Sequence, residues 1–258
     1  MRAHLLQLDL IWEDRAANHE LVERTLDTVE LDRGDLVVLP ELFDSGFSLN
    51  TDSTADREGT TLRFLVDLAD DLGVVIQGSR TVRDCHCNKA TNRATIVGPG
   101  QRLLCDYSKV HPFGYGREPE AFEGGRSVET YEWSSGNGRL TVCPAVCYDL
   151  RFPELFRRGV SLGAECFALG ANWPSARARH WRSLLIARAI ENQAFVLGVN
   201  RCGSDPHLGY AGGSLAIGPK GDVLGELGQD PGVLSIELDP ESVRAWRTEF
   251  PALEDRVL

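Results

Sequence analysis

The stretch CPAVCYDLRFPE, residues 143–154, shows how this chain is built. Apolar residues over Leu140–Cys147 indicate a buried strand that ends at Cys147. Farther along, Pro153 is well placed as the first residue of a helix, because its fixed φ suits that position and its missing N–H is not needed there. The stretch therefore predicts a strand, a tight turn and a helix in direct succession, with a thiol at the turn.

The same alternation of strands and helices continues in both directions from this stretch. Toward the N-terminus we expect strands His4–Leu10, Leu36–Leu39 and Val74–Gly78, helices Arg15–Leu31 and Leu62–Leu72, and a hairpin of Asn92–Val97 with Arg102–Tyr107. Toward the C-terminus we expect strands Glu165–Leu169, Phe195–Asn200, Ser214–Ile217 and Val233–Leu238, with a long helix over Ala176–Asn192. This order predicts a layered α/β fold. No linker or repeat divides the chain, so residues 1–258 are expected to form a single domain.

The charge and apolar pattern of the chain restrict its partners and location. The 27 basic and 38 acidic residues give a formal net charge of −11, which argues against nucleic acid as a partner. Asp9, Glu13 and Asp14 interrupt the first apolar run, and no run is long enough to span a bilayer, so neither a secretory signal nor a membrane partner is expected. A cytoplasmic protein follows as the prediction, with its seven cysteines reduced.

Three reactive side chains follow predicted strands. Glu41 comes after Pro40 at the end of one strand, Lys109 follows a second, and Cys147 ends a third. Enzymes of the α/β class place functional groups at the C-terminal ends of strands, and a turn before a helix exposes a thiol and favours its thiolate. Taken singly, each residue has an ordinary explanation: a glutamate or lysine in a solvated loop, and a buried structural cysteine.

Two other kinds of site compete with this interpretation. Cys85-His86-Cys87 has the composition of a metal site, but one residue between cysteines is not the usual zinc spacing and no second pair lies at a suitable distance. A cysteine–histidine–asparagine protease would need His111 or His180 as the partner of Cys147, and neither lies in a recognisable protease context. No metal and no cofactor is therefore expected.

The three segments together resemble the nitrilase, or carbon–nitrogen hydrolase, superfamily. The resemblance lies in Pro40-Glu41, in Lys109-Val110-His111 and in the run from Cys147 to Pro153, in this order over nearly the whole chain. It implies a four-layer αββα sandwich, a metal-free hydrolase of carbon–nitrogen bonds, and assembly into homodimers or higher homo-oligomers. Later segments resemble the ω-amidase group, whose members hydrolyse the terminal amide of 2-oxo acids such as 2-oxoglutaramate and 2-oxosuccinamate; these segments are Ala171–Pro174, His180-Trp181, Ala187–Gln193 and Asn200–Asp205.

The resemblance also implies a role for individual residues. Cys147 would be the nucleophile, Glu41 the general base and Lys109 the oxyanion stabiliser, helped by the backbone N–H of Tyr148. A second glutamate is expected in the loop after the lysine, where Glu118 fits best and Glu120 stays open.

The substrate-binding residues follow from the chemistry of a 2-oxo acid amide. Its carboxylate must be paired if it is buried, and arginine suits bidentate carboxylate binding. Arg177, Arg201 and Arg117 lie in segments expected to border the pocket, although each is at least as well explained as a solvated surface residue. The hypothesis is that Arg177 or Arg201 holds the substrate carboxylate. Phe43, Trp173 and Tyr148 could form an apolar wall, or belong to the core as most aromatic residues do.

Several functions remain open beside the ω-amidase. Within the same hydrolases, the alternatives are a deaminated-glutathione amidase, an N-carbamoyl hydrolase, another aliphatic amidase and, with less support, a true nitrilase; all act on a small molecule. From a different class, the chain could be a catalytically silent binding domain. The intact set of Glu41, Lys109 and Cys147 argues against that alternative.

Overall fold

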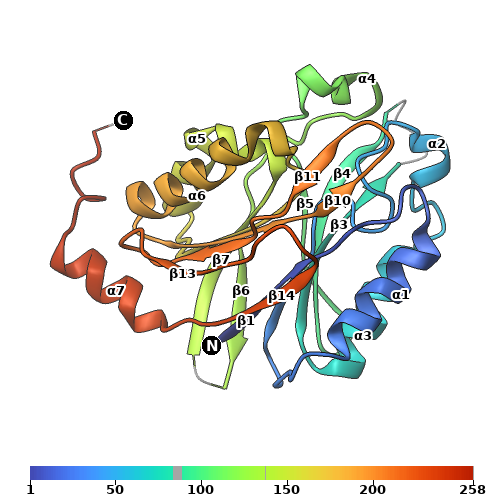
Figure 1. Cartoon of the computed structure of the whole chain (residues 1–258). Helices are drawn as coiled ribbons and strands as arrows, with labels where there is room; N and C mark the ends of the chain where they lie inside the picture. Colours follow the sequence, from blue (N-terminus) through green and yellow to red (C-terminus); the bar gives the residue numbers. More distant parts are fainter. Residues whose placement is uncertain (84–88, 137, 258) are drawn as a thin grey trace.

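Two six-stranded sheets pack face to face, and helices cover the outer face of each (Figure 1). The computed structural model describes residues 1–83, 89–136 and 138–257. The predicted four-layer α/β sandwich is confirmed. The segment Cys85–Cys87, which was weighed as a metal site, lies outside the described residues.

The first sheet combines a parallel centre with antiparallel flanks. Its strands, in spatial order, are β14 (Gly232–Glu237), β1 (Arg2–Gln7), β2 (Leu36–Val38), β3 (Val75–Val82), β4 (Thr91–Gly98) and β5 (Arg102–Ser108). Strands β1, β2 and β3 are parallel neighbours, and the remaining pairs are antiparallel. The predicted hairpin around Gly98-Pro99-Gly100 is confirmed as β4 and β5. Helices α1 (Arg15–Leu26) and α3 (Thr60–Leu72) cover the outer face.

The second sheet repeats this arrangement. Its strands, in spatial order, are β13 (Val223–Glu226), β12 (Leu215–Ile217), β9 (Phe195–Asn200), β8 (Cys166–Ala171), β7 (Gly138–Val146) and β6 (Tyr131–Ser135). Strands β7, β8 and β9 are the parallel neighbours. Helices α5 (Pro153–Ser161) and α6 (Ala178–Asn192) lie on the outer face (Figure 1). A separate hairpin of β10 (Cys202–Ser204) and β11 (Gly209–Ala211) stands beside the sheets.

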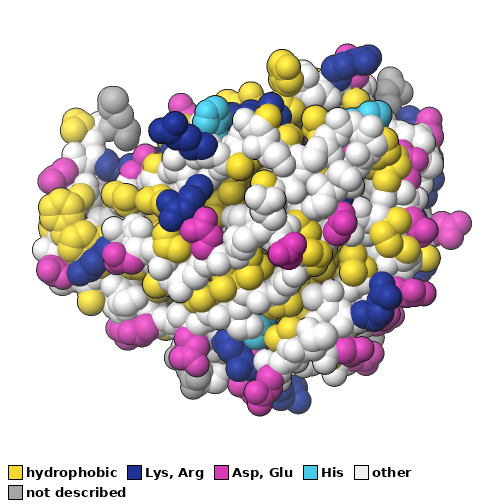
Figure 2. Space-filling model, viewed as in Figure 1, with side chains coloured by type: hydrophobic (Ala, Val, Ile, Leu, Met, Phe, Trp, Pro, Cys, Tyr) yellow, Lys and Arg dark blue, Asp and Glu magenta, His cyan; other side chains and the backbone are white. Residues whose placement is uncertain are grey.

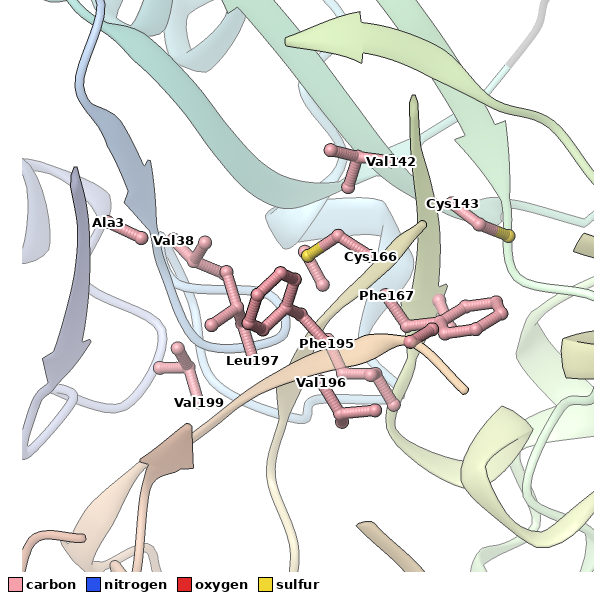
Figure 3. Packing of buried hydrophobic residues seen from close by; sticks show 14 of the residues in the cluster. Ala3, Val38, Val142, Cys143, Cys166, Phe167, Phe195, Val196, Leu197 and Val199 are labelled. Carbon is pink, nitrogen blue, oxygen red and sulfur yellow. The ribbon is translucent and has the colours of Figure 1, made fainter. Parts of the chain in front are cut away.

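The largest core cluster combines side chains between the two sheets with side chains between the second sheet and its outer helices (Figure 3). Successive side chains of a strand point to opposite faces, so Leu5 packs against the other sheet whereas Leu6 packs against the outer helices. Val38 and Val37 divide in the same way. Strands buried on both faces need unbroken apolar runs, and this explains why the sequence shows such runs instead of an alternation.

The helix expected over Arg15–Leu31 is shorter in the structure. It ends at Leu26, with Asp27 as its C-terminal cap. Negative charge is unfavourable at the negative end of a helix dipole, and Asp27 and Glu30 both fall in the region where the helix was expected to continue. Several short or peripheral elements were not predicted from the sequence pattern: α2 (Thr51–Thr54), α4 (Glu118–Ala121), α7 (Pro240–Glu249), β6, β10, β11 and β13.

The surface carries mixed charge. On the face shown in Figure 2, acidic, basic, apolar and uncharged side chains are interspersed and no continuous basic area forms. Within the described part of the chain, every helix is too short or too polar to cross a bilayer.

Candidate active site

The ends of several strands meet around one cavity of about 490 Å³. Glu41 follows β2, Lys109 follows β5 and Cys147 follows β7, and all three line this cavity. Asn172, which follows β8, lines it as well. Strands β7 and β8 are parallel neighbours, so Cys147 and Asn172 come from the same edge of the second sheet. The structure thus brings together the three residues that the sequence singled out.

The carboxylate of Glu41 is held from both sides. Its Oε1 accepts hydrogen bonds from Lys109 Nζ at 2.7 Å and from Asn92 Nδ2 at 2.9 Å. Its Oε2 accepts one from the backbone N–H of Asn172 at 3.0 Å. The Asn172 amide also donates to the backbone carbonyl of Glu41 at 2.6 Å. Because Glu41 is completely buried, these donors fix the carboxylate in one orientation.

Lys109 lies between two buried carboxylates. Its Nζ contacts Glu118 at 2.8 and 3.0 Å in addition to Glu41. Burial acts to lower the pKa of Lys109, but the charges of Glu118 and Glu41 outweigh it and raise the pKa above its usual value. Lys109 is therefore a permanent ammonium. Burial and the neighbouring Glu41 raise the pKa of Glu118, against the opposing effect of Lys109.

The structure distinguishes the two glutamates that the sequence left open. Glu118, the first residue of α4, is completely buried and also accepts a hydrogen bond from the backbone N–H of Phe113. Glu120 is exposed and forms a bidentate pair with Arg117 at 2.8 and 2.7 Å. Glu118 is the one beside Lys109, and both Glu120 and Arg117 belong to the surface.

Cys147 occupies a strained turn. Its φ is 45°, in the left-handed region that non-glycine residues rarely adopt. It begins a 3-10 turn, Cys147–Arg151, directly after β7. A backbone conformation of this kind costs on the order of 1–3 kcal/mol and is characteristic of functional sites. The sharp bend turns the thiol away from the strand and into the cavity that Cys147 lines.

The thiol of Cys147 is protonated in this environment. Burial and the negative charge of the Glu41 carboxylate raise the pKa of Cys147 well above its usual value, although Lys109 acts in the opposite direction. The expectation that a helix N-terminus would favour the thiolate is wrong, because burial dominates and α5 begins only at Pro153. Glu41 lines the same cavity and carries a carboxylate that can accept a proton.

Asn92 and Asn172 were missed by the sequence analysis. Asn172 could have been found, since it directly follows a buried strand as Lys109 does. Asn92 lies inside β4, where its only signal is a polar residue in a strand that is otherwise largely buried. Its partner Glu41 lies in the turn after β2, far away in the sequence, so the local sequence does not predict the contact.

Close packing at Gly170 places Asn172 against Glu41. A side chain at Gly170 would put its Cβ 2.5 Å from the carbonyl oxygen of Leu39 and 2.9 Å from the backbone nitrogen of Glu41. Real Cβ contacts are never this short, so only glycine lets β8 approach the segment after β2. The approach is what allows Asn172 to reach Glu41.

Replacing Gly170 with alanine should lower kcat by about 10²-fold, because moving a reacting group by about 1 Å has an effect of this size. The added methyl group would push Glu41 away from Asn172. Steady-state ammonia release measures the effect. Gly136→Ala is the matched control, since a Cβ there meets nothing within 4 Å. Wild-type kcat in a folded Gly170→Ala variant would contradict the argument.

The aromatic residues considered for the pocket wall lie in different places. Phe43 is completely buried under β3, beside Gly78, and its ring lies near those of His19 and Phe64. It belongs to the core and does not line the cavity. Trp173 and Tyr148 line a small recess that opens beside Cys147.

Arg177 and Arg201, the two arginines predicted to bind the substrate carboxylate, also lie in different places. Arg177 lines the recess, where a second arginine, Arg151, lies 4.8 Å from the Trp173 ring centre. Arg201 is completely buried, and its guanidinium donates to backbone carbonyls of Leu10 and Ser204 at 3.0 and 2.9 Å. Arg201 therefore joins the loop after β1 to the β10–β11 hairpin and does not face the recess. Arg151 was not among the residues predicted from the sequence.

Among the described residues, no group of three or more histidine, cysteine, aspartate or glutamate side chains is arranged to hold a metal ion. Lys109 supplies the positive charge of the cavity.

The family model for carbon–nitrogen hydrolases matches residues 2–248. The chain belongs to the carbon–nitrogen hydrolase family. The 2-oxoglutaramate amidase of Bacillus subtilis (strain 168) is 35% identical to this carbon–nitrogen hydrolase over 97% of the chain and 95% of the relative. The omega-amidase YafV of Escherichia coli (strain K12) is 33% identical over 99% and 96%. Membership of the nitrilase superfamily, as predicted, is confirmed.

A solved structure agrees with the fold of this carbon–nitrogen hydrolase. XC1258 from Xanthomonas campestris, a CN-hydrolase superfamily protein with an arsenic adduct in its active site, superposes with a TM-score of 0.93. The two chains are 35% identical, and the match covers 100% of this chain and 97% of the other. These relatives and the family together identify the chain as an amide-hydrolysing enzyme.

Proposed function

We propose that this carbon–nitrogen hydrolase is an ω-amidase that converts the terminal amide of a 2-oxo acid, such as 2-oxoglutaramate, into the acid and ammonia. The observation that carries the proposal is that Cys147, Glu41 and Lys109 line one cavity, with Lys109 Nζ 2.7 Å from Glu41 Oε1. The relatives named ω-amidase and 2-oxoglutaramate amidase favour this class of amide.

The first half of the reaction forms a thioester. Glu41 takes the proton from Cys147, and the sulfur attacks the amide carbonyl carbon. The negative charge that develops on the carbonyl oxygen is received by the Lys109 ammonium and the backbone N–H of Tyr148. As the tetrahedral intermediate collapses, the carbon–nitrogen bond breaks and Glu41 returns its proton to the departing ammonia.

The second half releases the acid. Glu41 removes a proton from water, and the hydroxide adds to the thioester carbonyl. The carbon–sulfur bond then breaks, and Glu41 passes the proton to the sulfur, which restores the Cys147 thiol. General acid–base help of this kind is typically worth about 10²–10⁴-fold in rate. In this scheme Glu118 contacts neither the substrate carbonyl oxygen nor the Cys147 sulfur. Its contacts with Lys109 at 2.8 and 3.0 Å keep the ammonium in place.

We assign the substrate carboxylate to the recess beside Cys147. It is lined by Arg177 and Arg151, whereas the larger cavity presents the acidic Glu13 and Asp205. A 2-oxo acid amide bound with its carboxylate toward the arginines would place its amide carbon near Cys147. Of the two predicted arginines, Arg177 is therefore the proposed ligand of the substrate carboxylate, and Arg151 lines the same recess.

Replacing Arg177 with methionine should raise KM for 2-oxoglutaramate by about 10- to 100-fold, since a hydrogen bond to a charged group is worth roughly 1.5–3 kcal/mol. The KM for an uncharged amide such as propanamide should change little. Arg179→Met, in which an exposed arginine two residues away is replaced, serves as the control. Unchanged KM for 2-oxoglutaramate in both Arg177→Met and Arg151→Met would remove these arginines from the proposal.

The substrate class is tested by ammonia release from a panel of compounds. The panel contains 2-oxoglutaramate, deaminated glutathione, N-carbamoyl amino acids, simple aliphatic amides and nitriles. The proposal expects the highest kcat/KM with 2-oxoglutaramate. A higher value with deaminated glutathione or an N-carbamoyl amino acid would assign the enzyme to that branch of the family instead.

A further inference from the structure

One acidic residue of the Cys147 turn has no part in the reaction described above. Asp149 lies two residues after Cys147 and is completely buried. Its carboxylate does not line the cavity or the recess. A buried carboxylate is stable only if its oxygens are paired, so its partners should reveal what it does.

Four donors from two separate segments surround this carboxylate. Oδ2 accepts from the Tyr107 hydroxyl at 2.8 Å and from the backbone N–H of Val146 at 3.0 Å. Oδ1 accepts from the backbone N–H of His111 at 3.0 Å and contacts its Nδ1 at 2.8 Å. Because an ionised carboxylate only accepts hydrogen bonds, Nδ1 must carry the proton in this contact.

These partners flank two of the reacting residues. Tyr107 and His111 stand on either side of Lys109, two residues away in each direction, and Val146 directly precedes Cys147. A single carboxylate therefore ties the segment that carries the ammonium to the turn that carries the thiol. His111 is held further by its ring, which stacks on Phe152 with centroids 3.7 Å apart and planes 7° apart.

The chemistry of the four partners requires a carboxylate. The hydroxyl, the two backbone N–H groups and the imidazole all donate, and none needs a donor from residue 149. An asparagine of the same shape would turn its NH₂ toward two of these donors and lose both hydrogen bonds. An alternative in which His111 acts directly on the substrate has no support, since its Nδ1 is occupied by Asp149 and it does not line the cavity.

We propose that Asp149 is a positioning residue that sets the place of the Lys109 ammonium relative to the Cys147 sulfur, with Tyr107 and His111 as its two arms. The proposal rests on the proposed reaction, in which Lys109 receives the oxyanion formed by attack of Cys147. It gives a function to the Tyr107–His111 segment and to the aspartate of the Cys147 turn that goes beyond holding the fold.

The test compares Asp149→Asn with the wild-type enzyme in steady-state ammonia release from 2-oxoglutaramate. We expect kcat to fall by about 10²-fold, as when one oxyanion donor is lost, with KM changed less than about threefold because Lys109 acts mainly on the transition state. Asp106→Asn is the matched control. Asp106 lies on β5 next to Tyr107, and its carboxylate contacts Thr95 and Arg93 at 2.7 and 3.1 Å, so kcat should be unchanged.

A second measurement separates positioning from a purely structural role. Lys109 favours the thiolate of Cys147, so a displaced ammonium should move the pH profile of Cys147 alkylation by iodoacetamide to higher pH. Alkylation is followed at the Cys147 peptide by mass spectrometry. A fall in kcat in Asp149→Asn without this movement of the profile would overturn the proposal, and so would a kcat within twofold of wild type.

Tyr107→Phe covers the case in which Asp149→Asn does not fold. This variant removes the hydrogen bond from the Tyr107 hydroxyl to Asp149 and should lower kcat by about 10-fold. Wild-type kcat and an unmoved alkylation profile would overturn the proposal. Cys147→Ala distinguishes a failure of the proposed reaction from a failure of the positioning role of Asp149. Activity that survives Cys147→Ala contradicts the proposed reaction itself, whereas an inactive Cys147→Ala beside a fully active Asp149→Asn contradicts only the positioning role.

Discussion

Replacing Cys147 with alanine should abolish ammonia release from every amide that the enzyme accepts. Among the described residues that line the cavity, Cys147 is the proposed nucleophile, and removal of the nucleophile from a covalent mechanism typically lowers kcat by about 10⁶-fold. Stability should change by only about 1 kcal/mol, because a single small side chain is shortened. Ammonia release and thermal unfolding, measured on the same preparation, separate the two effects.

Cys143→Ala is the matched control for this prediction. Cys143 lies inside β7, is completely buried and does not line the cavity. Burial raises the pKa of its thiol above the usual value, so it should be neither reactive nor required, and kcat should be retained. Ammonia release by Cys147→Ala at more than about 1% of the wild-type rate would contradict the proposed nucleophile.

Replacing Lys109 with methionine should damage both activity and stability. The lost oxyanion partner alone should lower kcat by about 10²–10³-fold. In addition, Glu41 and Glu118 would be left as two buried carboxylates without the cation that both contact. Breaking a buried ion pair in this way typically costs about 3–5 kcal/mol. Chemical denaturation measures the loss of stability, and ammonia release measures the loss of activity.

The stability of Lys109→Met should depend on pH in a defined direction. Burial and Glu41 already raise the pKa of Glu118, while Lys109 opposes them, so removing Lys109 should raise this pKa further. A carboxyl whose pKa is higher in the folded state favours folding below the pKa of the unfolded chain, and this contribution is lost as pH rises through the folded pKa. The variant should therefore be less destabilised near pH 5 than near pH 8.

Two further variants test this explanation of the pH effect. Lys109→Met combined with Glu118→Gln should regain stability at pH 8 but not activity, because it removes one uncompensated charge and restores no oxyanion partner. Lys220→Met, which removes an exposed lysine 3.6 Å from Glu249, should be nearly neutral, as expected for surface pairs. Equal destabilisation of Lys109→Met at both pH values would contradict the electrostatic explanation.

The sequence was sufficient for the layered fold and for the location of the three reacting side chains. Strands and helices follow from local apolar patterns, and Glu41, Lys109 and Cys147 could be singled out because each lies at or shortly after the end of a predicted strand. The choice of Glu118 over Glu120 could not be made in this way. Both residues lie in one short acidic segment, and only burial against Lys109 distinguishes them.

The preferred amide, the homo-oligomeric state and the cytoplasmic location stay predictions, and the first of them depends on the shape of the pocket. Phe43 and Arg201 show that local sequence does not predict which side chains face the pocket. Both lie in segments near the site, yet Phe43 turns under β3 and Arg201 turns toward the β10–β11 hairpin. The direction of a side chain is set by the packing of the elements around it, which a single segment does not specify.

By itself, the sequence determined the strand ends that carry Glu41, Lys109 and Cys147, because strands and turns arise from neighbouring residues. Only the tertiary structure decided how the three act together. The contact of Asn172 with Glu41 joins residues 131 positions apart, and it depends on the close approach of two sheets at Gly170. The protonated state of the Cys147 thiol likewise follows from burial and from the carboxylate of Glu41, which is far away in the sequence but close in space. Such effects depend on distances in space, which arise only when the layers pack.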